Sequence, residues 1–182
     1  MRMDSDDDDL ARAAAAGDRA AFAALLGRHY DRIFGLAFRL TGCRAEAEDL
    51  TQDICMALPA KLAGWRGEAR FTTWLYRVSV NAAHDRRRRM ASHAKAAGGW
   101  GDWETGRQAA MAEERAALDW LAEAMRALPD ELRDTAALVL GEELTQRQAA
   151  EVLGIAEGTV AWRMSEVKRR LKALHRGESG HG

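Results

Sequence analysis

The sequence has 182 residues, enough for one ordinary domain or for two small ones with modest cores. Its 27 Lys and Arg nearly balance 28 Asp and Glu, so the overall charge does not by itself indicate a polyanionic partner. Cys43 and Cys55 form neither a CxxC motif nor a zinc-ligand pattern, which excludes a disulfide framework as the basis of the fold. Because Pro is scarce and Ala and Leu are abundant, we expect an all-α protein.

The first residues are acidic and contain almost nothing that could be buried. We therefore expect residues 1–13 to form a disordered acidic tail, whose simplest role is to keep the chain soluble. The N-terminus lacks the basic and apolar segments of a targeting signal. No apolar run approaches the ~18 residues that span a bilayer, so we expect a cytoplasmic protein without membrane insertion.

Residues 14–92 are predicted to form a first helical domain. From Asp18 onward, apolar residues recur at helical spacing until Gly42, a typical C-terminal stop. A second amphipathic helix is predicted from about Ala45 to Leu62. The face opposite its apolar stripe is acidic and polar and carries Glu46, Asp49, Gln52 and Asp53. By itself, this pattern is compatible with a merely solvated surface.

A glycine-bounded loop and a basic helix follow. Residues 64–70 place one aromatic side chain, Trp65, beside two cations, Arg66 and Arg70. We expect Thr72 or Thr73 to cap the next helix. This helix carries Asn81 and ends in an unbroken basic run, Arg86, Arg87, Arg88 and Arg89. Because adjacent like charges repel one another unless an anion is near, the run indicates an anionic partner.

The middle of the chain loses helical periodicity. Residues 93–114 are rich in glycine and are predicted to be a flexible linker between two small helical domains. This linker contains two tryptophans, Trp100 and Trp103. Residues 115–176 are predicted to form the second domain, and residues 177–182 a disordered tail.

The stretch from Thr145 to Leu174 has the pattern of a helix-turn-helix. Thr145 and, three residues later, Gln148 match a reciprocal capping box. The small, glycine and branched positions that the motif needs are occupied by Ala150, Gly154 and Val160. Candidates for contacts in the major groove are Glu157, Thr159, Ala161, Trp162 and Arg163. Cations expected to hold the DNA backbone are Lys168, Arg169 and Lys172.

Three blocks follow one another in order: AEDLTQDI at 47–54, FTTWLYRVSVNAAHDRRRR at 71–89, and LTQRQAAEVLGIAEGTVAWRMSEVKRRL at 144–171. Together they resemble a bacterial RNA polymerase sigma factor of the extracytoplasmic-function (ECF) type. The resemblance implies a first domain that contacts core polymerase and opens the promoter −10 element, and a second domain that binds the −35 element. It also implies three partners: core RNA polymerase, through the β′ clamp helices and the β flap; promoter DNA; and an inhibitory anti-sigma protein.

The resemblance also implies roles for individual residues. Asp49, Gln52 and Asp53 fall where such factors dock on the β′ clamp helices. The loop from Gly64 to Phe71 falls where they capture an unstacked base, with Trp65 as a stacking wall and Asn81 as a hydrogen-bonding partner. The cations expected to accompany the −10 DNA are Arg66, Arg70, Arg86, Arg87, Arg88 and Arg89. A packing role for Trp65 is the alternative.

The second domain departs from the family pattern at three positions, Ala161, Trp162 and Glu166. These departures leave open whether Trp162 reads DNA, packs on the domain or meets a regulator. The chain shows no catalytic constellation and its five histidines are scattered, so we expect neither an enzyme nor a metal or cofactor. Two alternative functions are compatible with parts of the sequence: a sigma-like decoy that binds an anti-sigma protein, and a free-standing helix-turn-helix regulator.

Overall fold

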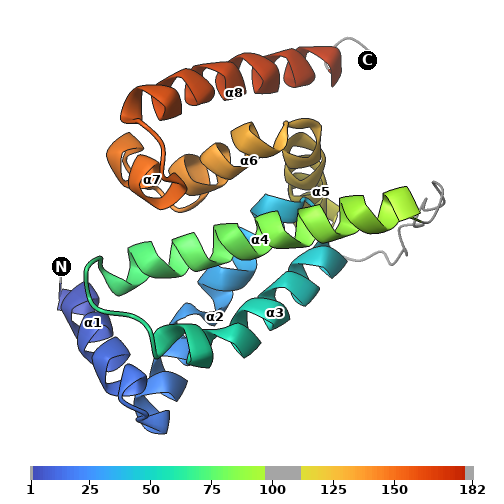
Figure 1. Ribbon diagram of the computed structural model, residues 1–182. Helices are drawn as coiled ribbons and strands as arrows, with labels where there is room; N and C mark the ends of the chain where they lie inside the picture. The colour runs from blue at the N-terminus through green and yellow to red at the C-terminus, as the bar shows by residue number, and fades with distance from the viewer. Residues whose placement is uncertain (1, 97–111, 179–182) are drawn as a thin grey trace.

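The computed structural model describes residues 2–96 and 112–178, with side chains for 6–92 and 118–174. Within these ranges the chain forms helices and no strand, which confirms the all-α prediction (Figure 1). No described helix is long and apolar enough to cross a bilayer. The elements in chain order are α1 (Arg2–Ala15), α2 (Arg19–Thr41), α3 (Arg44–Leu62), α4 (Phe71–Ala96), α5 (Ala112–Ala127), α6 (Asp130–Ala136), the π-helix η1 (Ala137–Gly141), α7 (Gln146–Leu153) and α8 (Glu157–Glu178).

The N-terminal residues form a helix, so the prediction of a disordered tail over residues 1–13 is wrong. α1 packs against α2, α3 and α4. Asp7 is buried, with its carboxylate 2.8 Å from His29 Nε2 and 3.0 Å from the Arg28 guanidinium. Ala11 is buried as well. The acidic charge that suggested a solvated end is thus partly matched by side chains of α2, more than 20 residues away in sequence.

The ends of α2 lie where the sequence predicts them. Asp18 caps the N-terminus by accepting hydrogen bonds from the backbone N–H groups of Ala20 and Ala21. Gly42 ends the helix with a φ of 67°, a conformation that favours glycine. A Cβ at this position would lie 2.9 Å from the carbonyl oxygen of Ala122, so glycine also allows α5 to approach the end of α2.

The N-terminus of α4 is capped from a distant part of the chain. α4 begins at Phe71, whose backbone N–H donates to Asp8 Oδ1 at 2.7 Å. The prediction that Thr72 or Thr73 caps this helix is therefore wrong. Because Asp8 lies 63 residues earlier, only the packing of α1 brings the capping carboxylate to the helix.

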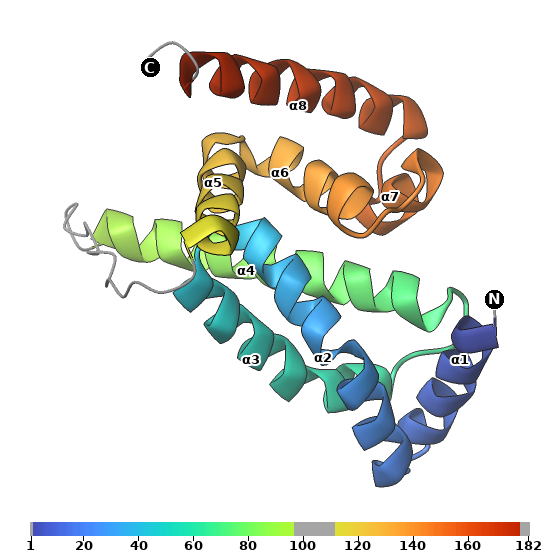
Figure 2. The same cartoon turned by 180° about the vertical axis from the view of Figure 1, so that it is seen from behind.

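The helix-turn-helix consists of α7 and α8. Thr145 and Gln148 form the predicted capping box, in which the Gln148 N–H donates to Thr145 Oγ1 and the Thr145 N–H donates to Gln148 Oε1. Gly154 has a φ of 66° at the turn, and Val160 is fully buried between the helices. α8 packs on α6 and α7, on the side of this domain that faces away from α1–α4 (Figures 1 and 2).

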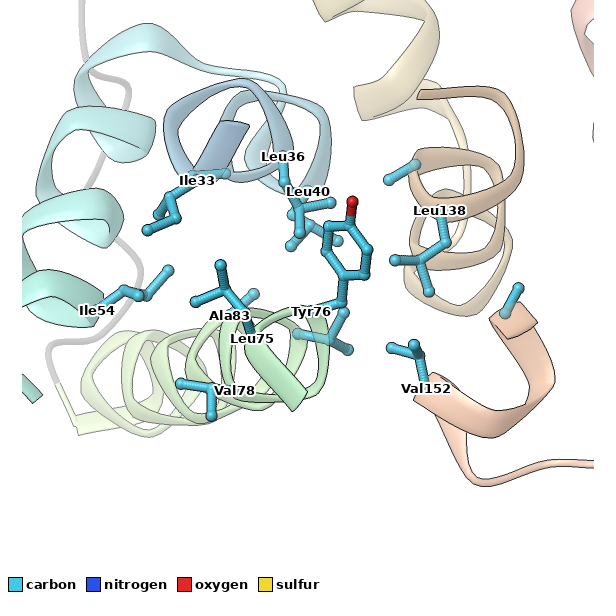
Figure 3. Packing of buried hydrophobic residues seen from close by; sticks show 14 of the residues in the cluster. Ile33, Leu36, Leu40, Ile54, Leu75, Tyr76, Val78, Ala83, Leu138 and Val152 are labelled. Atoms are coloured by element: carbon cyan, nitrogen blue, oxygen red, sulfur yellow. The ribbon is translucent and has the colours of Figure 1, made fainter. Parts of the chain in front are cut away.

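The apolar cores of the two halves join. The expectation that each domain has a core of its own is wrong, because one buried cluster runs from α1 to α8. Figure 3 shows Tyr76 of α4 among Leu40 of α2, Leu138 of η1 and Val152 of α7. α4 is therefore covered on more than one side, by α2 and α3 and also by α7.

Two predicted segments lie partly outside the described residues. Residues 97–111, with Trp100 and Trp103, are not described, whereas the two ends of the predicted linker 93–114 belong to α4 and α5. α8 runs to Glu178, so the tail predicted for residues 177–182 begins too early. Residues 179–182 lie outside the described part of the chain.

A substitution tests the docking of α1. We expect Asp8→Ala to lower the free energy of unfolding by about 1 kcal/mol, because the Phe71 N–H loses its cap. The corresponding fall in Tm is roughly 2–4 °C, measurable by thermal unfolding. Asp9→Ala is the matched control, since this exposed carboxylate pairs only with Arg12 among the described contacts. If both variants are as stable as the parent chain, Asp8 does not cap α4 and the docking of α1 is contradicted.

Candidate functional site

The acidic face of α3 is exposed and is organised by a cation of α4. Asp49, Gln52 and Asp53 all lie at the surface. The Arg86 guanidinium donates to Asp49 Oδ2 at 2.9 Å and to Asp53 Oδ2 at 3.4 Å. Met56, one turn further along α3, is strongly exposed beside them. The face therefore combines fixed carboxylates with an adaptable apolar side chain, a composition suited to protein contacts.

The four arginines of the basic run have different partners. Arg86 pairs with Asp49 and Asp53 of the acidic face, and Arg87 pairs with Asp134 of α6. Arg88 and Arg89 remain exposed and bond locally to Asp85, Arg88 to its carboxylate and Arg89 to its backbone carbonyl. The hydrogen bond from Arg88 lowers the pKa of the Asp85 carboxyl. Only the second half of the run is thus open to an external anion in this arrangement.

Asn81 shares the outer surface of α4 with these two cations. It is exposed and lies two helical turns before Arg88, so the two side chains fall on the same face. The structure therefore brings Asn81, Arg88 and Arg89 together as one polar strip. It separates Arg86 and Arg87 from them.

A pocket opens between the 64–70 loop and the first turns of α4. It has a volume of about 370 Å³ and is open to solvent. The loop residues that line it are Gly64, Trp65, Arg66, Glu68 and Ala69, and α4 contributes Trp74 and Arg77. Trp74 and Arg77 were missed at the level of sequence, although their three-residue spacing places them on one helical face next to the loop. Arg70 and Asn81 are not among the lining residues.

Trp65 packs in the core as well as bordering this pocket. Its side chain is 9 % exposed, and its ring meets that of Phe71 edge-on at a centroid distance of 6.4 Å. Its indole Nε1 is buried and has no hydrogen-bond partner among the described residues. Trp65 therefore has the packing role that the sequence left open as the alternative. Its contact with a base stays a prediction.

The N-terminal half of α8 presents a mixed surface. Glu157 is exposed, Thr159 is half-buried, and Trp162 has 65 % of its surface exposed without a covering element in the described residues. Arg163, in contrast, is only 13 % exposed and its guanidinium donates to Glu131 of α6 at 2.9 Å. This cation holds two helices together, which removes it from the open surface.

The C-terminal half of α8 carries two kinds of cation, some paired with a carboxylate and others without an ion pair. Arg169 and Arg170 both donate to the Glu166 carboxylate, at 2.6 and 2.7 Å. The hydrogen bonds from Arg169 and Arg170 lower the pKa of Glu166 to about 2, so this acid is ionised at physiological pH. Lys168 and Lys172 are exposed, one turn apart, and form no ion pair within the described residues.

The described residues contain no group of three or more His, Cys, Asp or Glu side chains that could hold a metal ion. What they contain is an acidic face on α3, a solvent-open pocket lined by cations and aromatic rings, and a helix-turn-helix.

Comparisons with known proteins agree with the fold and the motifs. The family model "Sigma-70 region 2" matches residues 25–93. The ECF RNA polymerase sigma factor SigM of Mycobacterium tuberculosis is 34% identical over 175 residues, which cover 95% of this chain and 86% of that protein. The ECF RNA polymerase sigma factor SigW of Bacillus subtilis is 28% identical over 169 residues, which cover 86% of this chain and 89% of that protein.

A solved structure has the same fold. The sigma factor RpoE of Bartonella quintana, in a co-crystal with the anti-sigma factor NepR, superposes with a TM-score of 0.74 at 22% sequence identity, covering 85% of this chain and 96% of that one. With a close relative at this level of identity along almost its whole length, the chain belongs to the ECF family of RNA polymerase sigma factors.

Proposed function

We propose that this chain binds core RNA polymerase and directs it to promoters, with the first domain on the −10 element and the second on the −35 element. The observation that carries the proposal is the pocket at the 64–70 loop. A protein that only reads duplex DNA has no need for a pocket of this size beside exposed cations. A factor that holds an unstacked base of melted DNA needs such a pocket.

The pocket has the chemistry that an unstacked base requires. Its volume of about 370 Å³ is in the range that accommodates a small planar ligand. Trp74 offers aromatic surface for stacking and Trp65 borders the pocket, while Arg66 and Arg77 supply positive charge for the adjacent phosphates. Asn81, Arg88 and Arg89 continue this surface along α4, where they would follow the DNA backbone.

The acidic face of α3 is the proposed docking surface for core polymerase. Asp49 and Asp53 are held by Arg86, so their charges are oriented before a partner arrives. Gln52 adds a hydrogen-bonding group and Met56 an apolar contact at the same face. We therefore assign Arg86 to this surface in place of the −10 DNA.

The second domain is proposed to bind the −35 element through α8. Its N-terminal half would enter the major groove with Glu157, Thr159 and Trp162, and Lys168 and Lys172 would contact phosphates. Trp162 is exposed and can meet apolar groups of bases such as the thymine methyl. Arg169 contributes less than its charge suggests, since Glu166 neutralises it.

An anti-sigma protein is the proposed regulator. The Bartonella factor with this fold was solved with such a partner. A decoy that only binds this regulator would not need the open pocket or the exposed Arg88 and Arg89. A free-standing regulator would leave the acidic face of α3 without a role.

Promoter selection with a reconstituted enzyme tests the proposal. The chain is mixed with core RNA polymerase of its own bacterium and a promoter library, and the transcripts are sequenced. We expect initiation at a defined set of sites that share two upstream elements. A correctly folded chain that stimulates no start site would refute the function.

Reversing the charge of the acidic face tests its role. We expect Asp49→Lys combined with Asp53→Lys to weaken binding to core polymerase by at least ten-fold, roughly 1.4 kcal/mol or more, because two charges of the interface change sign. DNA binding by α8 should be retained. Glu48→Lys is the control, as it alters a neighbouring exposed acid of α3 that pairs with Arg44. A similar loss of polymerase binding in Glu48→Lys would contradict the assignment of Asp49 and Asp53 to the docking surface.

The pocket is tested with forked promoter DNA that carries an unpaired base or an abasic site. We expect the parent chain to bind the base-containing fork about ten- to hundred-fold more tightly, since stacking contributes roughly 1–3 kcal/mol per base. Trp74→Ala should lose this difference and Trp74→Phe should keep most of it. If Trp74→Ala discriminates as the parent does, the pocket does not hold the base.

Releasing two arginines of α8 tests the electrostatics of the second domain. In Glu166→Gln the carboxylate that neutralises Arg169 and Arg170 is gone, so both can contact phosphates. We expect tighter DNA binding and a plot of log affinity against log salt that is steeper by up to about 2, at roughly 0.9 per phosphate contact. Glu123→Gln on α5 is the control for net charge. An unchanged slope would show that these arginines face away from DNA.

A further inference from the structure

The buried carboxylate of Asp7 fixes how α1 lies on the first domain. It lies 2.8 Å from His29 Nε2 and 3.0 Å from the Arg28 guanidinium, and the Asp7 and His29 side chains are each only 6 % exposed. Turning or shifting α1 would leave this carboxylate buried without its partners, which is costly. Because neighbouring residues of a helix point about 100° apart, fixing Asp7 also fixes the direction of Asp8.

The start of α4 is held by two contacts with Phe71. Asp8 Oδ1 accepts a hydrogen bond from the Phe71 backbone N–H at 2.7 Å. The His29 ring, which bonds to Asp7, meets the Phe71 ring edge-on at a centroid distance of 5.3 Å. Figure 1 shows α1 beside the loop that leads into α4. The backbone and the ring of Phe71 are therefore both held by contacts that begin at α1.

Phe71 in turn touches both aromatic residues that line the pocket. Its ring centroid lies 6.4 Å from that of Trp65 and 5.8 Å from that of Trp74. Phe71 is buried beneath the pocket residues and does not line the pocket itself. Among the described residues, none of α1 or α2 lines it either. A chain of contacts thus runs from α1 through Phe71 to the walls of the pocket.

The loop before Phe71 is anchored at its two ends. At its start the Trp65 N–H donates to the Leu62 carbonyl oxygen at 2.9 Å. At its end the Phe71 N–H donates to Asp8. Between these points the chain is mostly exposed, and Gly67 has a φ of 71°, a conformation that favours glycine. A short exposed loop follows the positions of its ends, so the bond to Asp8 sets one side of the pocket.

We propose that α1 is a positioning element that presets the walls of the base pocket through Phe71. Asp8 and His29 hold Phe71 in place, and Phe71 supports the side of Trp74 that faces the core. Trp74 then stands ready to stack on an unstacked base, the function proposed above, on which this inference rests. A side chain held in place before a base arrives loses less freedom on binding. The acidic helix thus contributes to base recognition without touching DNA.

Four variants of the full-length chain separate positioning from stability. Asp8→Ala removes the cap of α4, and Asp8→Asn keeps one, because asparagine caps a helix as well as aspartate does. Asp9→Ala controls for the loss of one negative charge from α1. Asp18→Ala controls for stability, since it removes a cap of the same kind from α2, which binds the N–H groups of Ala20 and Ala21. Thermal unfolding identifies a temperature at which all variants are folded.

Each variant is assembled with core polymerase and tested with two forked promoter DNAs, one with an unpaired base and one with an abasic site in its place. Both forks carry the same phosphates, so the ratio of their affinities cancels any general effect of charge. We expect Asp8→Ala to lower this ratio about three- to ten-fold, the range that the ordering of one side chain costs in binding. The other three variants should keep the ratio of the parent chain, and all four should bind core polymerase as the parent does.

Amide hydrogen exchange followed by NMR measures the contact itself without DNA. We expect the Phe71 amide to exchange about ten-fold faster or more in Asp8→Ala than in the parent chain, because its hydrogen bond is lost. In Asp18→Ala, which keeps this hydrogen bond, the Phe71 amide should exchange as it does in the parent.

Several results overturn the proposal. The Phe71 amide is no more exposed to exchange in Asp8→Ala, or it exchanges faster while the ratio of affinities stays that of the parent. Asp18→Ala or Asp8→Asn lowers the ratio as much as Asp8→Ala does. Asp8→Ala raises the ratio, which would show that the carboxylate competes with DNA. Failure of the proposed function looks different, because then the parent chain itself binds both forks equally, whatever the Phe71 amide shows.

Discussion

The packing of α4 on two sides is the constraint on which the rest of the structure depends. One stripe of this helix, with Phe71, Leu75 and Val78, faces the other helices of the first domain. A second stripe carries Tyr76 and Val80 and then changes to His84 and Arg87, which meet acids of the second domain. Because these residues recur at intervals of three or four, they form a continuous face. A single helix thereby sets the position of the loop pocket and of the helix-turn-helix.

Charge pairing explains why a nearly neutral chain can have distinct binding surfaces. Several cations predicted to contact DNA form ion pairs within the fold: Arg86 pairs with Asp49 and Asp53 of α3, and Arg163 pairs with Glu131 of α6. Those that stay open, such as Arg88 and Lys172, lie on outer surfaces of α4 and α8. The distinction follows from geometry, since the Arg86 and Arg163 side chains are themselves largely buried and each has a carboxylate within 2.9 Å.

The N-terminal helix shows how local reasoning fails when partners are remote. A run of aspartates has no apolar stripe of its own and is read as disordered. In the folded chain, Asp7 meets His29 and Asp8 caps Phe71, so the acids are fixed by contacts across the domain. The same reason explains why the sequence predicted the wrong capping residue for α4, since the true cap, Asp8, lies far away in the chain. A cap is recognisable in sequence only when it comes from the adjoining residues, as at Asp18 and Thr145.

The sequence by itself determined the features that arise from neighbouring residues: the helical class, the ends of α2, the capping box, the turn at Gly154 and the ordered blocks of the sigma family. These depend on backbone conformation and on periodicity, which a short stretch encodes. Only the tertiary structure decided that Trp74 and Arg77 line the pocket, that Arg87 turns to Asp134 and that Glu142 is buried between two cations. Such contacts join residues far apart in the chain. They are stabilised by the packing of the whole fold, so a local sequence pattern does not predict them.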